Sequence, residues 1–187
     1  MLELNQTIPD NYNVYYNGWT RTNTASSSGV SIHHPAGDIK NISTYTATLL
    51  STQWGSATGS HWSVQWSATT NGHGATEGGS SGSPIFNASG QIVGTLTGGG
   101  SCCVQGGCGS PSFGPNVRDQ YGKMSYHWNS NGNANNRRLD IHLDPVGNGS
   151  AMSIGGADSP CSTSAADAGI TSISSPADEV CGLSFTP

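Results

Sequence analysis

Apolar residues along this chain recur at every second position, which is the spacing of β-strands rather than that of helices. The clearest case is residues 61–68, where Trp62, Val64 and Trp66 alternate with other residues. The same pattern, bounded by Gly, Ser, Asn and Pro, predicts further extended segments over residues 13–19, 29–34, 39–50, 84–86, 91–96 and 122–128. The run Asn87-Ala-Ser-Gly90 joins two of them as a hairpin turn would. We therefore expect an all-β fold of short strands.

One helix is predicted, around residues 135–143. Leu139 and Leu143 lie four positions apart there, and Pro145 would end the helix. The length of 187 residues suits one domain and a short additional piece.

The composition changes after the predicted helix. Residues 147–160 are rich in Gly, Ser and Ala, as a linker is. Cys161 and Cys181 then bracket a segment of small residues that ends in a strand-like run. We expect a folded domain over residues 1–146, a linker over 147–160 and the start of a secreted β-module over 161–187.

Charge excludes some functions. Charged residues make up only 9% of the chain, the net charge is −5, and Lys and Arg together number 6. Without a basic stripe, we expect no nucleic-acid partner. No apolar run is long enough for a transmembrane helix, and we expect no membrane association.

The cysteines and the start of the chain bear on its compartment. The chain begins Met-Leu-Glu-Leu without the features of a signal peptide, and it holds five cysteines, an odd number. A cytosolic protein with free thiols is one reading. The adjacent Cys102-Cys103 pair and the low charge favour the other, a secreted protein with disulfides whose true start lies upstream.

The segment that points to chemistry is Gly79-Ser-Ser81-Gly-Ser-Pro84. A nucleophilic serine must project its hydroxyl into a cleft at which backbone amides also point, and glycines permit such a turn. The amides of Gly79 and Ser81 would then form the oxyanion hole. A flexible Gly/Ser loop is the alternative, but the strand, hairpin and glycine run that follow favour a catalytic turn.

This segment resembles the Gly-Asp-Ser-Gly-Gly-Pro signature of trypsin-like serine proteases in the chymotrypsin superfamily. Over residues 2–146 the chain more closely resembles the bacterial lysyl endopeptidases of that superfamily. The landmarks include Leu2-Glu-Leu-Asn5, Ile32-His-His-Pro35, Val64-Gln-Trp66, Thr76-Glu77, Gly98-Gly99, Tyr121-Gly122 and Leu143-Asp-Pro145.

The resemblance implies a double-barrel fold of which this chain supplies the second six-stranded antiparallel β-barrel and a short C-terminal helix. It implies cleavage of peptide bonds after lysine, with arginine left open, through an acyl-enzyme on Ser81. No cofactor or metal is implied. The implied substrate-binding residues are Asp119 at the base of the primary pocket, Trp54 in the cleft, and Thr97, Gly98 and Gly99 beside it.

Two of these assignments have alternatives or departures. By itself, Asp119 would be read as an exposed loop acid paired with Arg118, and only the resemblance favours the pocket role. Thr97 stands where lysyl endopeptidases carry a histidine, so we expect no imidazole stacked on Trp54. The absence of a histidine there also disfavours the glutamate specificity of other relatives.

The resemblance also concerns residues that this chain lacks. The family takes its base from a Thr-Ala-x-His-Cys motif in the first barrel and its orienting aspartate from just before the segment in which Met1 stands. We expect both outside the chain, with the N-terminal barrel as a partner and the isolated chain nearly inactive. None of the histidines matches the base, and His73 is a weak candidate.

Disulfide pairings follow from the same resemblance. One of Cys102 and Cys103 is expected to bridge to the missing segment, and the other to pair locally with Cys108. Cys161 would pair with Cys181.

Three functions remain open at this point. The chain is part of a secreted serine endopeptidase acting on protein or peptide substrates, a catalytically dead peptide-binding module, or an adhesive β-domain. The intact serine motif favours the first.

Overall fold

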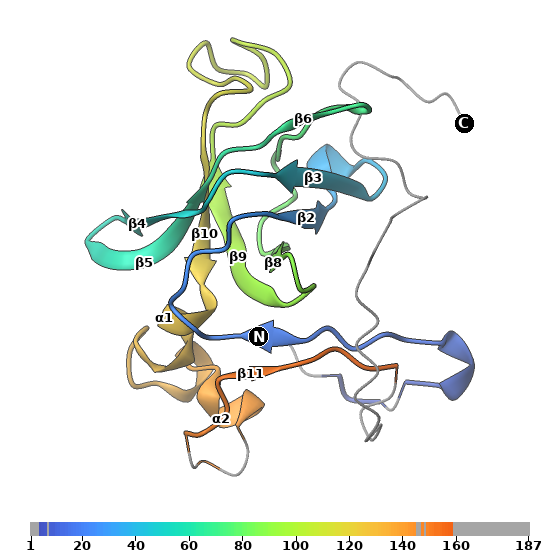
Figure 1. Ribbon diagram of the computed structural model, residues 1–187, viewed down its shortest axis with the longest axis vertical. Helices are drawn as coiled ribbons and strands as arrows, with labels where there is room; N and C mark the ends of the chain where they lie inside the picture. Colours follow the sequence, from blue (N-terminus) through green and yellow to red (C-terminus); the bar gives the residue numbers. More distant parts are fainter. Residues whose placement is uncertain (1–3, 7, 145–146, 148, 159–187) are drawn as a thin grey trace.

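The computed structural model describes residues 4–6, 8–144, 147 and 149–158, and these are mostly strand and loop (Figure 1). The strands are β1 (Trp19–Thr20), β2 (Gly29–His33), β3 (Asn41–Tyr45), β4 (Leu50–Trp54), β5 (Ala57–Val64), β6 (Ala68–Thr69), β7 (Gly72–His73), β8 (Pro84–Asn87), β9 (Ile92–Gly99), β10 (Asp119–Lys123) and β11 (Ser153–Ile154). The helical segments are η1 (Asp10–Tyr12), η2 (Pro35–Gly37), α1 (Met124–Asn129), η3 (Asn135–Arg137) and α2 (Asp140–Leu143).

The main sheet follows the order β3-β2-β8-β9-β10-β5-β4, and each neighbouring pair is antiparallel. β1 joins it through a short parallel contact with β9 and pairs antiparallel with β11. The all-β antiparallel fold is therefore confirmed. Closure of this sheet into a six-stranded barrel stays a prediction.

The core lies where the alternating apolar positions of the central strands meet. Trp62, Val64 and Trp66, whose alternation marked residues 61–68, are all buried. They pack with buried side chains of neighbouring strands and loops: Tyr45, Leu49, Ile85, Val93, Leu96 and Tyr121. This core fixes the ends of β9 and β10, which carry the predicted pocket residues.

Several predicted strands are confirmed and others differ in extent. The segments 29–34, 84–86 and 91–96 correspond to β2, β8 and β9, and the last two form the predicted hairpin. The long segment 39–50 divides, because β3 ends at Tyr45 and β4 begins at Leu50. Of residues 13–19, only Trp19 enters a named strand.

The predicted strand over residues 122–128 is wrong, because β10 ends at Lys123 and helix α1 begins at Met124. Met124 and Trp128 are spaced four apart and are both buried, as on one face of a helix. Trp128 packs on Trp19 with ring centroids 4.9 Å apart. The apolar face of α1 therefore covers the β1 end of the sheet.

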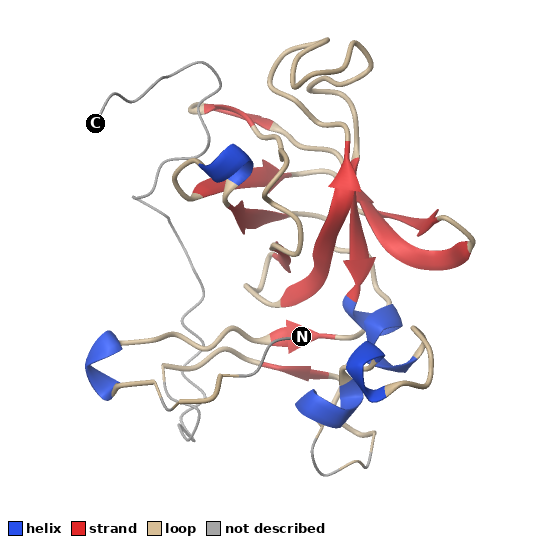
Figure 2. Cartoon of the chain, turned by 180° about the vertical axis from the view of Figure 1, so that it is seen from behind, coloured by secondary structure: helices blue, strands red, loops and turns tan. Residues whose placement is uncertain are grey.

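The single helix expected over residues 135–143 is two separate turns, η3 and α2. Arg138 between them has extended backbone angles, and the Asn-rich start offers little helix propensity. Leu139 and Leu143 each still pack against the cluster of Trp19, Met124 and Trp128. These turns and α1 gather at one end of the sheet (Figures 1 and 2).

Part of the segment predicted as a linker pairs with the start of the chain. Ser153 and Ile154 form β11 beside β1, and Ala157 bridges to Tyr16. The predicted module over residues 161–187 lies outside the described residues. Among the described helices, none has the length and apolar character needed to cross a bilayer.

Candidate active site

Ser81 lies exposed at the tip of the turn that leads into β8. Gly79 and Gly82 on either side have φ angles of +103° and +83°, which glycine adopts without strain. The amide of Gly82 donates to Leu96 O of β9 at 2.8 Å, so the turn is tied to the main sheet. The glycines thus present the Ser81 hydroxyl at the surface on a fixed backbone.

The backbone amides of this turn fall into two sets. Those of Ser80, Gly82 and Ser83 donate to carbonyls inside the protein. Within the described part of the chain, the amides of Gly79 and Ser81 have no acceptor. Two unpaired amides beside an exposed serine hydroxyl can bind an oxyanion. This arrangement suits the role predicted for Gly79 and Ser81, which stays a prediction.

A cavity of about 430 Å³ opens next to Ser81. Its walls come from the η2 turn, the serine turn, the end of β9 and the loop before β10: Ala36, Thr76, Glu77, Gly78, Ser81, Leu96, Gly98, Gly99, Ser101, Cys108 and Phe113. The predicted site residues Ser81, Gly98 and Gly99 are thus brought together around one cavity.

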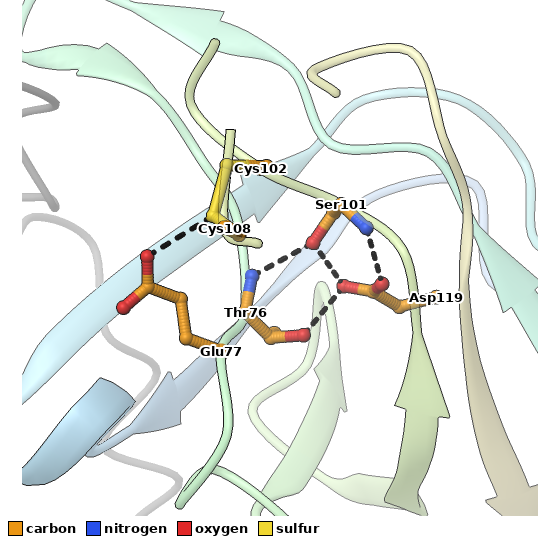
Figure 3. Close-up of a disulfide and its surroundings, with 6 residues drawn as sticks. All are labelled: Thr76, Glu77, Ser101, Cys102, Cys108 and Asp119. Carbon is orange, nitrogen blue, oxygen red and sulfur yellow. Dashed lines mark hydrogen bonds between the residues drawn. A yellow bond between two sulfur atoms is a disulfide. The ribbon is translucent and has the colours of Figure 1, made fainter. Parts of the chain in front are cut away.

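Asp119 is fully buried and is hydrogen-bonded to Thr76 and Ser101, which line the cavity (Figure 3). Its Oδ2 accepts hydrogen bonds from Thr76 Oγ1 at 2.7 Å, Ser101 Oγ at 2.6 Å and Trp66 Nε1 at 2.7 Å. Its Oδ1 accepts from the amide of Ser101 at 3.1 Å. The alternative of an exposed acid paired with Arg118 is wrong, because Asp119 is 0% exposed.

The glycine pair at the end of β9 brings Asp119 and Trp54 close to the cavity. A Cβ on Gly99 would lie 2.0 Å from Asp119 Oδ1, so only glycine lets the carboxylate reach the wall. A Cβ on Gly98 would lie 3.3 Å from Trp54 Cη2. Gly98 and Gly99 therefore form a thin part of the cavity wall. The Trp54 indole lies against Gly98, and the Asp119 carboxylate lies against Gly99.

Trp54 stacks on the imidazole of His61, which corrects the expectation that no imidazole would lie against this indole. The ring centroids are 5.8 Å apart and the ring planes differ by 27°. His61 comes from β5 rather than from position 97, and Thr97 Oγ1 lies 2.9 Å from its Nε2. The hairpin β4–β5 places Trp54 and His61 side by side, and pattern analysis along one strand could not reveal this pairing.

Hydrogen bonds assign the proton of His61. Ser60 Oγ donates its hydrogen to Ala57 O at 2.6 Å, so it accepts from His61 Nδ1. Nε2 is then unprotonated and accepts from Thr97 Oγ1. Burial lowers the pKa of His61, and the charges of His127 and Lys123 lower it further. His61 is therefore neutral at neutral pH.

None of the described histidines hydrogen-bonds to Ser81. His73 lies on β7, where its Nδ1 is 2.8 Å from Gly74 O. His33 lies at the end of β2, and its Nδ1 is 2.9 Å from the hydroxyl of Ser80, the neighbour of Ser81. This contact joins segments 47 positions apart, so the pattern of residues along the chain did not reveal it.

A disulfide joins Cys102 to Cys108, which confirms the expected local pairing of Cys108 (Figure 3). Cys108 Sγ lies 3.3 Å from Glu77 Oε1. A disulfide sulfur has no hydrogen to donate, so this is a contact that packs the loop against the pocket wall. Cys103 is also disulfide-bonded. The predicted Cys161–Cys181 bridge lies outside the described residues.

In the ranges that the structure describes, no cluster of metal-ligating side chains is found. No three His, Cys, Asp or Glu side chains there are close enough to hold an ion.

Comparison with known proteins gives a consistent result. The family described as lysyl endopeptidase, C-terminal domain, matches residues 1–122. A lysyl endopeptidase of Pseudomonas aeruginosa is 36% identical over 108 residues, which cover 55% of this chain and 22% of that protein. The chain thus spans about a fifth of the length of this relative. The match includes the serine turn, the glycine pair and Asp119, and the chain belongs to the lysyl endopeptidase C-terminal domain family.

Proposed function

We propose that this chain carries the nucleophile and the primary specificity pocket of a secreted serine endopeptidase that cleaves after lysine. The observation that carries the proposal is the meeting of three features at one cavity. These are the exposed hydroxyl of Ser81, the unpaired amides of Gly79 and Ser81, and the carboxylate of Asp119 behind the wall.

The reaction would begin with attack of Ser81 Oγ on the scissile carbonyl. A base takes the hydroxyl proton, the amides of Gly79 and Ser81 hold the oxyanion, and the amine leaves with a proton from the same base. The acyl-enzyme is then hydrolysed by water. The base and its orienting acid would come from another part of the full-length protein, because none of the described imidazoles contacts Ser81.

Specificity would come from the carboxylates at the cavity. Thr76 and Ser101 line the cavity and both donate to Asp119, so a lysine ammonium that reaches them would lie near its charge. Glu77 adds a second carboxylate to the lining. An uncharged side chain would leave the buried charge of Asp119 without a cation, which lowers its transition-state binding. The cavity of about 430 Å³ is open to arginine as well.

Secretion is supported by the Cys102–Cys108 disulfide, since such bonds persist in oxidising compartments. The second candidate is a peptide-binding module without catalysis. The absence of any described histidine at Ser81 favours it, because an unactivated serine hydroxyl is a poor nucleophile.

Hydrolysis of a lysyl ester by the full-length protein decides between the two. We expect turnover that Ser81→Ala abolishes while Ser83→Ala, a change in the same turn, leaves most of it. Lysyl-peptide binding that persists in Ser81→Ala, without turnover in the unsubstituted protein, would instead establish the binding module.

A further inference from the structure

A buried hydrogen-bond chain connects the serine turn to two strands of the sheet. His33 of β2 is 2% exposed, and its Nδ1 lies 2.9 Å from Ser80 Oγ. Its Nε2 lies 3.1 Å from Ser43 Oγ of β3. Ser43 in turn bonds both to the carbonyl of Ala75, at 2.8 Å, and to the amide of Ala75, at 3.1 Å. This chain of hydrogen bonds therefore joins both ends of the segment 75–80.

The direction of each bond in this chain is determined. Ser43 has one hydroxyl hydrogen, and it goes to Ala75 O, so Ser43 can only accept from His33. His33 Nε2 therefore carries the hydrogen and donates to Ser43. Nδ1 of the neutral ring is then an acceptor, and Ser80 Oγ donates to it.

His33 is held neutral. Burial, with a smaller contribution from the neighbouring His34, lowers the pKa of His33 from 6.5 to about 4. A charged imidazole would carry a hydrogen on Nδ1 as well, and Ser80 could no longer donate to it. The neutral ring is thus the form in which the chain of bonds is complete.

Ser80 stands between the two residues whose amides are unpaired. It is 1% exposed, so its side chain points inward while Ser81 points out. The middle of the same segment is also held, because the Ala36 amide donates to Gly78 O at 2.7 Å. Few degrees of freedom remain for the peptide units on either side of Ser80.

We propose that His33 is a positioning residue, which acts through Ser80 to hold the amides of Gly79 and Ser81 and the hydroxyl of Ser81 in their reactive arrangement. This inference rests on the proposed function. It adds a residue pair that touches neither the substrate nor the reacting atoms.

The test compares four substitutions in the full-length protein. Ser80→Ala removes the donor, and His33→Leu removes the acceptor at similar bulk. His33→Asn is the conservative variant, because its Oδ1 can accept near the place of Nδ1. Ser31→Ala is the matched control, since it removes another fully buried serine hydroxyl from β2, one that bonds to Pro84 O and Tyr121.

The first readout is the rate at which a fluorophosphonate probe phosphonylates the Ser81 hydroxyl with loss of fluoride. We expect Ser80→Ala and His33→Leu each to slow it on the order of 10- to 100-fold, since small displacements of reacting groups have such effects. The double variant should react no more slowly than either single variant, because both substitutions break the same chain of hydrogen bonds. His33→Asn and Ser31→Ala should stay close to the unsubstituted rate.

The second readout is amide hydrogen exchange of residues 77–83, which needs no activity. Ser80→Ala and His33→Leu should raise it locally, and Ser31→Ala should not. Unchanged exchange in both Ser80→Ala and His33→Leu would overturn the inference. So would a labelling rate in the double variant that is lowered by the product of the two single losses. If the unsubstituted protein is not labelled at Ser81, the proposed function fails, and the exchange measurement alone decides the positioning role.

Discussion

The buried carboxylate of Asp119 organises the residues of the cavity wall, and in the proposed function it also selects the substrate. Its carboxylate accepts four hydrogen bonds, three of them from Thr76 and Ser101, which line the cavity. These donors satisfy the hydrogen-bonding capacity of the buried carboxylate, which would be costly to bury without partners. A substrate cation would add a full opposite charge to this arrangement.

Neutralising Asp119 should remove the preference for lysine. We expect Asp119→Asn to lower kcat/KM for lysyl esters by about 10²-fold or more, because a buried charge partner is lost. The kcat/KM for esters of uncharged residues should fall far less. The measurement is therefore the ratio of kcat/KM for the lysyl ester to kcat/KM for the uncharged ester. Asp140→Asn makes the same charge change on α2, away from the cavity, and should leave the ratio unchanged. An equal loss for both substrates would contradict the pocket role.

His33 should make stability depend on pH. The pKa of His33 is about 4 in the folded protein, against an ordinary value of 6.5, so the unfolded chain takes up the proton first as pH falls. Stability is therefore fully present above pH 6.5 and is lost progressively down to about pH 4. The loss due to His33 should approach about 3 kcal/mol. Urea unfolding between pH 7.5 and 4.5 should show that the unfolding free energy of His33→Asn depends less steeply on pH than that of the unsubstituted protein. An equal dependence on pH in both proteins would contradict the buried neutral state of His33.

At the scale of elements, the hairpin β4–β5 carries an aromatic platform to the cavity. Trp54 is 46% exposed, its ring rests against Gly98, and its stacking on His61 fixes its orientation. His61 is fixed in turn by Ser60 and Thr97. An exposed tryptophan held in this way is suited to contact a substrate chain beside the pocket.

Removing the indole should reduce binding rather than stability. We expect Trp54→Ala to raise KM for peptide substrates by about 10-fold, the scale of one aromatic contact, with a small change in melting temperature. Leu50→Ala is a matched control, because Leu50 lies on the same strand and is 51% exposed. If both variants alter KM equally, the platform has no specific role.

The Cys102–Cys108 disulfide should stabilise the wall that contains Cys108 and Phe113. Closing so short a loop contributes about 2 kcal/mol in the chain-entropy description. Replacing both cysteines by alanine should lower the unfolding free energy by about that amount and weaken lysyl-substrate binding. Equilibrium unfolding and KM, measured together, test the two effects. An unaltered KM would show that the disulfide does not shape the pocket.

The sequence was informative where local patterns carry the structure. The alternation of Trp62, Val64 and Trp66 predicted three buried positions correctly, although strand β5 ends at Val64, and Asn87–Gly90 predicted the β8–β9 hairpin. It failed at residues 124–128, where Tyr, His and Trp have strand propensity but tertiary packing on Trp19 selects a helix. The His61–Trp54 and His33–Ser80 contacts join separate segments, so no single-segment pattern contained them.

At the scale of the whole molecule, the described part of the chain brings the exposed Ser81, the proposed nucleophile, to a cavity, and none of its histidines hydrogen-bonds to Ser81. Its sheet places the serine turn, the glycine pair and Asp119 together, and the helices at the other end support β1 and β11 (Figures 1 and 2). Within the proposed function, catalysis therefore requires the full-length protein.

The isolated chain should hydrolyse lysyl esters only at a trace rate. Without a general base, the Ser81 hydroxyl keeps its proton and attacks slowly. The full-length protein, measured at the same concentration, is the control. Turnover by the isolated chain at a rate comparable with that of the full-length protein would mean that one of its own histidines serves as the base.

The most direct test of the account is to trap the acyl-enzyme. The full-length protein is mixed with a slowly deacylating lysyl-like ester and quenched, and the modified peptide is identified by mass spectrometry. The account predicts a single acyl group on Ser81, absent in Ser81→Ala and formed far more slowly in Asp119→Asn. An acyl group on another residue, or none on Ser81 while the ester is turned over, would contradict it.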